Sequence, residues 1–177
     1  MKKWVLCIVL SSFLPVLLWG EARALGVNVT PSPFDLAGAG STMLIQVNVE
    51  DVSDLGGLEF KLSFDPSVLT IQNQSKVVEG AFLSGALVWR KDIGTPGLLK
   101  YGATVDPGAN GSGTLVQITF TVLDHEACAQ LSLQDVVLVD TSIPPNKLTL
   151  DSVRNAIAEG CGLAKTIMTI VLNVLLK

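Results

Sequence analysis

The segment 58–64 constrains the fold more than any other part of the chain. Its apolar residues Leu58, Phe60, Leu62 and Phe64 are separated by the polar residues Glu59, Lys61 and Ser63. A period of two predicts a β-strand that buries one face and exposes the other. The strand must end at Asp65-Pro66, because proline fixes φ and cannot donate to a neighbouring strand.

Several other segments repeat this apolar alternation. We expect further strands at 27–29, 43–49, 87–89, 98–105, 115–123 and 131–139, with a closing segment at 148–157. The intervening segments 51–54, 91–97 and 106–113 are rich in Asp, Gly or Pro and are predicted to be connections. Short strands with few helical windows predict an all-β antiparallel sandwich, and the long connections favour jelly-roll topology.

The N-terminal segment 1–24 has the pattern of a secretory signal peptide. Lys2 and Lys3 precede an apolar run at 5–19, and Ala22-Arg23-Ala24 forms a small-x-small cleavage site. Cleavage is predicted after Ala24, which implies export. The alternative is that this segment is retained as an N-terminal membrane anchor.

The C-terminal segment 161–177 differs in composition from the predicted domain at 25–160. Apolar residues recur there at helical spacing: Ile167, Ile170, Val171, Val174 and Leu175. We predict a short helical tail that is too short to span a bilayer comfortably. It can pack on the sandwich, lie in a membrane interface, or be a truncated sorting signal processed at Cys161.

Charge and cysteine usage exclude some classes of function. The whole chain carries a formal charge of −4, and removal of the predicted signal peptide makes it about −6 with no basic cluster. Nucleic acid is therefore an unsuitable partner. Cys128 and Cys161 can form one disulfide in an oxidising compartment, although the sequence leaves their geometry open. Neither cysteine has the spacing of a zinc site.

The sequence has no convincing catalytic constellation. The single histidine, His125, stands beside Glu126 in a predicted turn, and no nucleophile accompanies it. Asp51 and Asp54 form a carboxylate pair of the kind that glycosidases use, but aspartates in such a segment more often cap turns. We predict a non-enzymatic protein without a cofactor, and no feature supports calcium binding.

The strand at 58–64 and two later strands resemble the cohesin family, the dockerin-binding modules of cellulosomal scaffoldins. The pattern F-x-L-x-[YF]-D-P-x-x-L is matched by Phe60, Leu62, Phe64, Asp65, Pro66 and Leu69. The patterns G-x-L-x-x-I-x-F-x-V and L-x-D-V-x-L-x-D are matched from Gly113 to Val122 and from Leu133 to Asp140. The resemblance covers roughly 27–158 and implies a jelly-roll sandwich of about nine strands.

The resemblance also implies a partner-binding face, since cohesins hold dockerins on one flat sheet surface. The family's Asn-x-Asp pair falls on Gly57 and Glu59, its exposed aromatic near Trp89, and its later acidic position on Val105 beside Asp106. Neighbouring outward positions complete the predicted face with Lys61, Lys100, Gly102 and Thr104. Alternatively, Trp89 is a core residue and Glu59 a solvated one, while Tyr101 is expected to be core.

The function predicted from the sequence is recognition of a dockerin-like protein in an extracellular or cell-surface assembly linked to polysaccharide degradation. One alternative is a carbohydrate-binding module, since the fold superfamily includes these. Such modules need a row of exposed aromatic residues, which this chain lacks. A second alternative is a structural module of the cell surface or the secretion apparatus. Contact of the tail with a membrane stays open.

Overall fold

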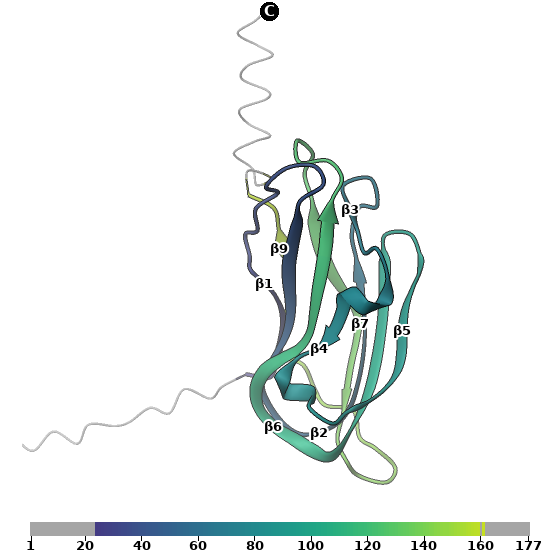
Figure 1. Ribbon diagram of the computed structural model, residues 1–177. Coiled ribbons are helices and arrows are strands. Elements are labelled where there is room, and N and C mark those ends of the chain that lie inside the picture. The colour runs from purple at the N-terminus through teal and green to yellow at the C-terminus, as the bar shows by residue number, and fades with distance from the viewer. Residues whose placement is uncertain (1–23, 160, 162–177) are drawn as a thin grey trace, which may run out of the picture.

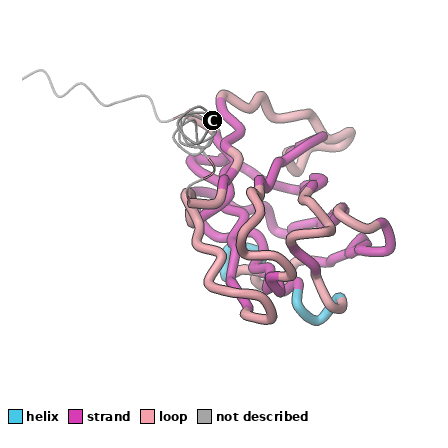
Figure 2. The backbone as a smooth tube through the Cα atoms, turned by 90° about the horizontal axis from the view of Figure 1, so that it is seen from above, coloured by secondary structure: helices cyan, strands magenta, loops and turns pink. Residues whose placement is uncertain are grey.

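The computed structural model describes residues 24–159 and 161 of the 177 residues. Strands make up most of the described backbone, as Figure 2 shows. The elements are β1 (Gly26–Thr30), β2 (Thr42–Ser63), β3 (Leu69–Thr70), η1 (Gln74–Lys76), β4 (Val77–Glu79), η2 (Ala81–Leu83), β5 (Leu87–Thr95), β6 (Leu98–Val122), β7 (Gln130–Val139), β8 (Ser152–Arg154) and β9 (Ala156–Ile157). The prediction of an all-β sandwich of about nine strands is confirmed.

Two long strands, β2 and β6, run antiparallel to each other through both layers of the sandwich (Figure 1). In the first layer, the start of β2 pairs with β1 and with the end of β6, while β3 and β4 pair with β6 and β8 lies parallel to β1. In the second layer, the end of β2 lies between the start of β6 and β7. β5 pairs with the outer edge of β6, so the strand order of this layer is β7–β2–β6–β5.

The predicted connections at 51–54 and 106–113 are wrong, because both segments lie inside continuous strands. The predicted connection at 91–97 is too long, because β5 continues to Thr95. Asp51 and Asp54 adopt the left-handed region with φ of 52° and 57°, and the register shifts around them. Their backbone N–H groups donate to Ser112 Oγ at 2.9 Å and to Asn110 Oδ1 at 2.8 Å. Side chains of β6 thus accept hydrogen bonds from the backbone N–H groups that the irregular β2–β6 ladder leaves without a backbone partner. Residues that are typical of turns form β-bulges here.

The inward faces of both layers form one hydrophobic core. Phe60 and Tyr101, from paired strands, are 1% and 0% exposed, and their rings stack with centroids 5.4 Å apart. The apolar residues that alternate along the late part of β6 are all fully buried: Val116, Ile118, Phe120 and Val122. Leu115 is buried as well because the β2–β6 register shifts beside it. The strand periods predicted from the sequence therefore place the core correctly.

A charged cluster joins β4 of the first layer to β5 of the second. Lys91 Nζ lies 2.7 Å from Glu79 Oε1 and donates to the Val77 carbonyl at 2.8 Å. Burial alone raises the pKa of Glu79, but the hydrogen bond and charge of Lys91 outweigh it and the pKa falls below its usual value. Burial, and then the neighbouring Glu79 carboxylate, raise the pKa of the Tyr101 hydroxyl, so that side chain stays neutral.

Some predictions concern the chain ends. The signal peptide, apart from Ala24, and the helical tail beyond Cys161 lie outside the described residues. The disulfide that the sequence leaves possible between Cys128 and Cys161 is not formed: Cys128 is exposed in the loop before β7, and Cys161 is half-buried against the core. The two helices of the described part are single 3₁₀ turns, and neither has the length or apolar character to cross a membrane.

Truncation of Phe60 tests the assignment of the inward face. We expect Phe60→Ala to lower the free energy of unfolding by about 3–5 kcal/mol, because it removes a buried ring and leaves a cavity beside Tyr101. Urea unfolding followed by circular dichroism would measure the change. Leu44→Ala is the control, since Leu44 is 51% exposed on the outside of the same strand. Equal effects of the two substitutions would contradict the assignment.

Candidate functional site

The outer face of the second layer brings together most of the residues predicted to bind a partner. Strand register places them in rows across the face. Gly57 pairs with Thr104 and Val139, Glu59 with Gly102 and Val137, and Lys61 with Lys100 and Gln134. On the far side of β6, Leu87 pairs with Thr104 and Arg90 with Gly102. We call this surface, formed by the outward residues of β7, β2, β6 and β5, the outer sheet face.

The charged residues of the outer sheet face pair with neighbours on adjacent strands. Glu59 Oε1 lies 2.7 Å from Arg90 Nη1, and Lys61 Nζ lies 2.6 Å from Asp135 Oδ2. Lys100 Nζ lies 3.4 Å from Asp92 Oδ2. The Gly94 N–H donates to Asp92 Oδ1 at 2.9 Å. This hydrogen bond and the nearby Lys100 hold the pKa of the Asp92 carboxyl below its usual value. Exposed pairs of this kind contribute little to stability, so a partner can replace them.

The sequence did not indicate the cations and anions that complete these pairs. Arg90 and Asp92 belong to no motif, and Asp135 is part of the L-x-D-V-x-L-x-D pattern, which does not indicate an ion pair with Lys61. Their role follows from strand register, which brings β5 and β7 beside the residues that the sequence did single out.

Trp89 lies on the outer sheet face and not in the core. Its side chain is 53% exposed, because a register shift between Val88 and Arg90 turns it outward. A Cβ at Gly102 would stand 2.4, 2.6 and 2.8 Å from three consecutive atoms of the six-membered ring. Such similar distances mean that the ring meets Gly102 with its face. The glycine therefore allows the indole to lie over the β6 backbone, and the core alternative for Trp89 is wrong.

Beside Trp89 the outer sheet face is hollowed by a cavity of about 640 Å³. Six of the predicted residues line it: Gly57, Glu59, Trp89, Thr104, Val105 and Asp106. Sequence reasoning missed the other wall, which comes from the end of β7 and the following loop and includes Val137, Val139, Asp140, Thr141, Ser142, Ile143 and Pro145. Figure 1 shows this loop in yellow-green at the lower end of the sandwich.

The loop that forms this wall is held by two aspartates. Asp140 accepts from the Asn146 N–H at 2.8 Å and the Ser142 N–H at 3.1 Å, and these donors lower the pKa of its carboxyl. Asp54, from the bulge in β2, accepts from Thr141 Oγ1 at 2.8 Å. Ile143, between these anchors, is 98% exposed. The fixed loop presents an aliphatic side chain at the mouth of the cavity.

One predicted contact residue is buried. Val105 is 7% exposed and belongs to the hydrophobic core, since it alternates inward between the exposed residues Thr104 and Asp106. It is nevertheless among the residues that line the cavity. The acidic position that the family resemblance implies here therefore corresponds to Asp106, which is exposed at the cavity.

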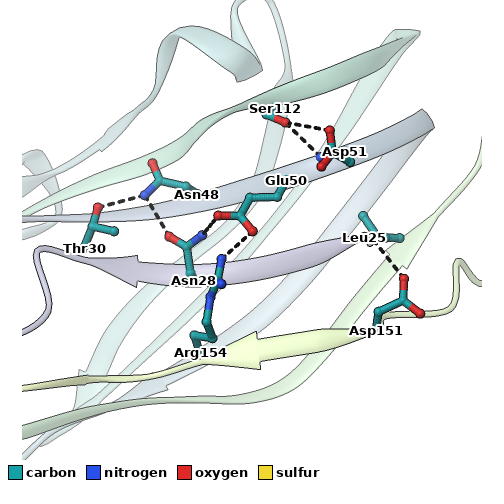
Figure 3. Close-up of polar contacts among 9 residues, drawn as sticks. All are labelled: Leu25, Asn28, Thr30, Asn48, Glu50, Asp51, Ser112, Asp151 and Arg154. Atoms are coloured by element: carbon teal, nitrogen blue, oxygen red, sulfur yellow. Dashed lines mark hydrogen bonds and ion pairs between the residues drawn. The ribbon is translucent and has the colours of Figure 1, made fainter. Parts of the chain in front are cut away.

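The outer face of the first layer is different, because its polar groups satisfy one another (Figure 3). Asn48 Nδ2 donates to Thr30 Oγ1 at 2.8 Å and to Asn28 Oδ1 at 3.2 Å. Asn28 Nδ2 donates to Glu50 Oε1 at 2.7 Å, and Glu50 also pairs with Arg154. This network leaves few open donors or acceptors around β1. The exposed aromatic and the cavity both lie on the opposite side of the molecule.

The geometry gives no sign of catalysis or of a metal centre in the described part of the chain. His125 is exposed and lies 3.1 Å from Glu126 of its own loop. Among residues 24–159 and 161, no group of three or more His, Cys, Asp or Glu side chains is arranged to hold a metal ion. What the outer sheet face offers is a rigid surface with an aromatic platform, ion pairs and a cavity.

Comparison of this antiparallel sandwich with known proteins identifies its family. The family model described as "Cohesin domain" matches residues 35–150, more than half of the chain. The chain therefore belongs to the cohesin family. Among curated proteins, none matches the sequence significantly.

Solved structures share the fold at low sequence identity. A non-cellulosomal cohesin from the archaeon Archaeoglobus fulgidus is 20% identical with a TM-score of 0.60, covering 82% of this chain and 96% of its own. The sixth cohesin of scaffoldin B from Acetivibrio cellulolyticus, solved with a dockerin, is 13% identical with a TM-score of 0.61, covering 76% and 97%. A type II cohesin from the same organism's cellulosome is 15% identical with a TM-score of 0.58, covering 77% and 94%.

Substitution of Gly102 tests the position of the indole. We expect Gly102→Ala to displace the Trp89 ring, because the new methyl group would overlap it, while the fold is retained since the ring can rotate into solvent. Nuclear Overhauser contacts between the Trp89 indole and residue 102 would be lost. Gly94→Ala, on the same hairpin and away from the indole, is the control. Unchanged contacts in the Gly102 variant would contradict this geometry.

Proposed function

We propose that this chain is a non-catalytic, exported recognition module that binds a dockerin-type protein through the outer sheet face. The single observation that carries the proposal is the exposed Trp89 ring lying on Gly102 beside the cavity. A large, rigid aromatic group at the centre of a mixed polar and apolar surface is the usual anchor of a protein interface. The family assignment supports a protein partner, since solved relatives are described as cohesins in complex with dockerins.

The ion pairs of the outer sheet face suit the same role. Arg90, Asp92, Lys100 and Lys61 are each partly exposed and lie between strands that hold them in place. Paired charges on a rigid sheet give a partner a fixed pattern of attraction and repulsion, which contributes specificity more than affinity.

The described residues are poorly suited to direct polysaccharide binding. A planar glycan face needs several exposed aromatic rings, but Phe34, Phe60, Tyr101 and Phe120 are at most 2% exposed. Among the described aromatic residues, only Trp89 is largely exposed. A protein partner therefore accounts for the surface better than a glycan.

Location and assembly belong to the proposal as well. The predicted signal peptide at 1–24 supports export to the cell surface or the extracellular space. A cohesin there would join a larger assembly, and polysaccharide degradation is the activity that such an assembly would serve. The Archaeoglobus fulgidus relative is described as non-cellulosomal, so the fold also occurs outside cellulosomes.

A double substitution on the outer sheet face tests the proposed interface. We expect Glu59→Arg with Trp89→Ala to abolish capture of dockerin-bearing proteins of the source organism without unfolding the chain. The reversed charge would face Arg90, and the exposed anchor would be missing. Binding would be measured by pull-down and calorimetry on the full chain, and folding by circular dichroism.

The matched control is Asp35→Arg with Leu44→Ala, which makes the same kinds of change at exposed residues outside the outer sheet face. Capture retained by the double variant, or lost equally in the control, would contradict the proposed interface. Retention of the unmodified chain on insoluble polysaccharide without dockerin capture would favour a carbohydrate-binding module. Absence of both would favour a structural module.

A further inference from the structure

The cavity on the outer sheet face has a composition that selects one kind of side chain. Its walls include the aliphatic side chains of Val137, Val139 and Ile143, with Trp89 beside them. Its ionisable lining residues are the acids Glu59, Asp106 and Asp140, and none of the basic residues in the described part of the chain lines it. An apolar space bordered by carboxylates suits a long aliphatic stem that ends in a positive charge.

The three acids are not equivalent. Glu59 is paired with Arg90 at 2.7 Å, and Asp140 accepts several hydrogen bonds from its own loop. Asp106 is exposed, and within the described part of the chain no cation or hydrogen-bond donor is paired with it. It is therefore the carboxylate of the cavity that is available to a cation from outside.

Trp89 adds a second attraction for a cation. Since one face of its six-membered ring covers Gly102 and the side chain remains 53% exposed, the other face is open beside the cavity. A guanidinium or ammonium group over an indole face is attracted by the electrons of the ring, and more strongly when it is desolvated. A neutral sugar would stack on the same ring but would leave the charge of Asp106 uncompensated.

We infer that this cavity receives a lysine or arginine side chain of the protein partner, with its stem against Val139 and Ile143 and its charged end between Asp106 and Trp89. The inference rests on the proposed function in taking the occupant from a protein. The available carboxylate and the aliphatic walls favour a basic side chain over a glycan.

Small probes test the cavity without knowledge of the partner. Butylguanidinium reproduces the end of an arginine side chain, and butylurea has nearly the same shape without the charge. We expect butylguanidinium to shift the amide resonances of Thr104, Asp106 and Ile143 and the Trp89 indole resonance of the ¹⁵N-labelled full chain. Saturation is expected in the millimolar range because the probe is small. Butylurea should bind at least fivefold more weakly.

The matched variants are Asp106→Asn, which removes the available charge, and Asp35→Asn, which removes an exposed charge elsewhere. We expect Asp106→Asn to weaken butylguanidinium binding at least fivefold and Asp35→Asn to leave it unchanged. Equal binding of butylurea, no shifts with butylguanidinium, or shifts at these residues with cellobiose in its place would each overturn the inference.

The dockerin experiment separates the inference from the proposed function. Dockerin capture that is unaffected by Asp106→Asn would overturn the inference and leave the proposed function standing. Butylguanidinium binding that depends on Asp106, in a chain that captures no dockerin, would overturn the dockerin proposal and support the cavity as a receptor for a basic side chain.

Discussion

The pairing of β2 with β6 is the constraint on which the rest of the structure depends. Each strand crosses both layers, so a single antiparallel ladder fixes the two halves of the sandwich relative to each other. The bulges in the middle let the ladder bend (Figure 1). Short strands then add to its edges: β1, β3 and β4 in one layer, and β5 and β7 in the other.

The bulge also fixes the candidate site. Asp54 holds a left-handed backbone conformation, and its carboxylate accepts from Thr141 at the start of the cavity wall. A Cβ at Gly56 would stand 2.5 Å from the Asp140 carbonyl oxygen, so the chain after β7 can lie against β2 only because that residue is glycine. The same irregularity that bends the sandwich therefore positions the loop that carries Ile143.

The sequence predicted the core more completely than the site for a physical reason. Core positions repeat along one strand, so alternation in 58–64 or 115–122 identifies them without knowledge of neighbours. Site positions are combined across strands: Arg90 joins Glu59 and Trp89 covers Gly102 only through the register of β5. The segments 51–54 and 106–113 were wrongly predicted to be connections, because turns and β-bulges use the same types of residue. Matching the family's pattern along this one strand likewise placed its acidic contact at Val105, one residue from the exposed Asp106.

The contrast between the two outer faces supports the proposal that recognition belongs to one of them. Around β1, amides and carboxylates saturate each other, so a partner would have to break internal hydrogen bonds to gain its own. On the outer sheet face, charges are held in exposed pairs that lose little when exchanged, and Trp89 and Ile143 already present apolar surface to solvent. Binding there buries apolar groups that folding left exposed, and the rigid ladder beneath limits the entropy lost in ordering them.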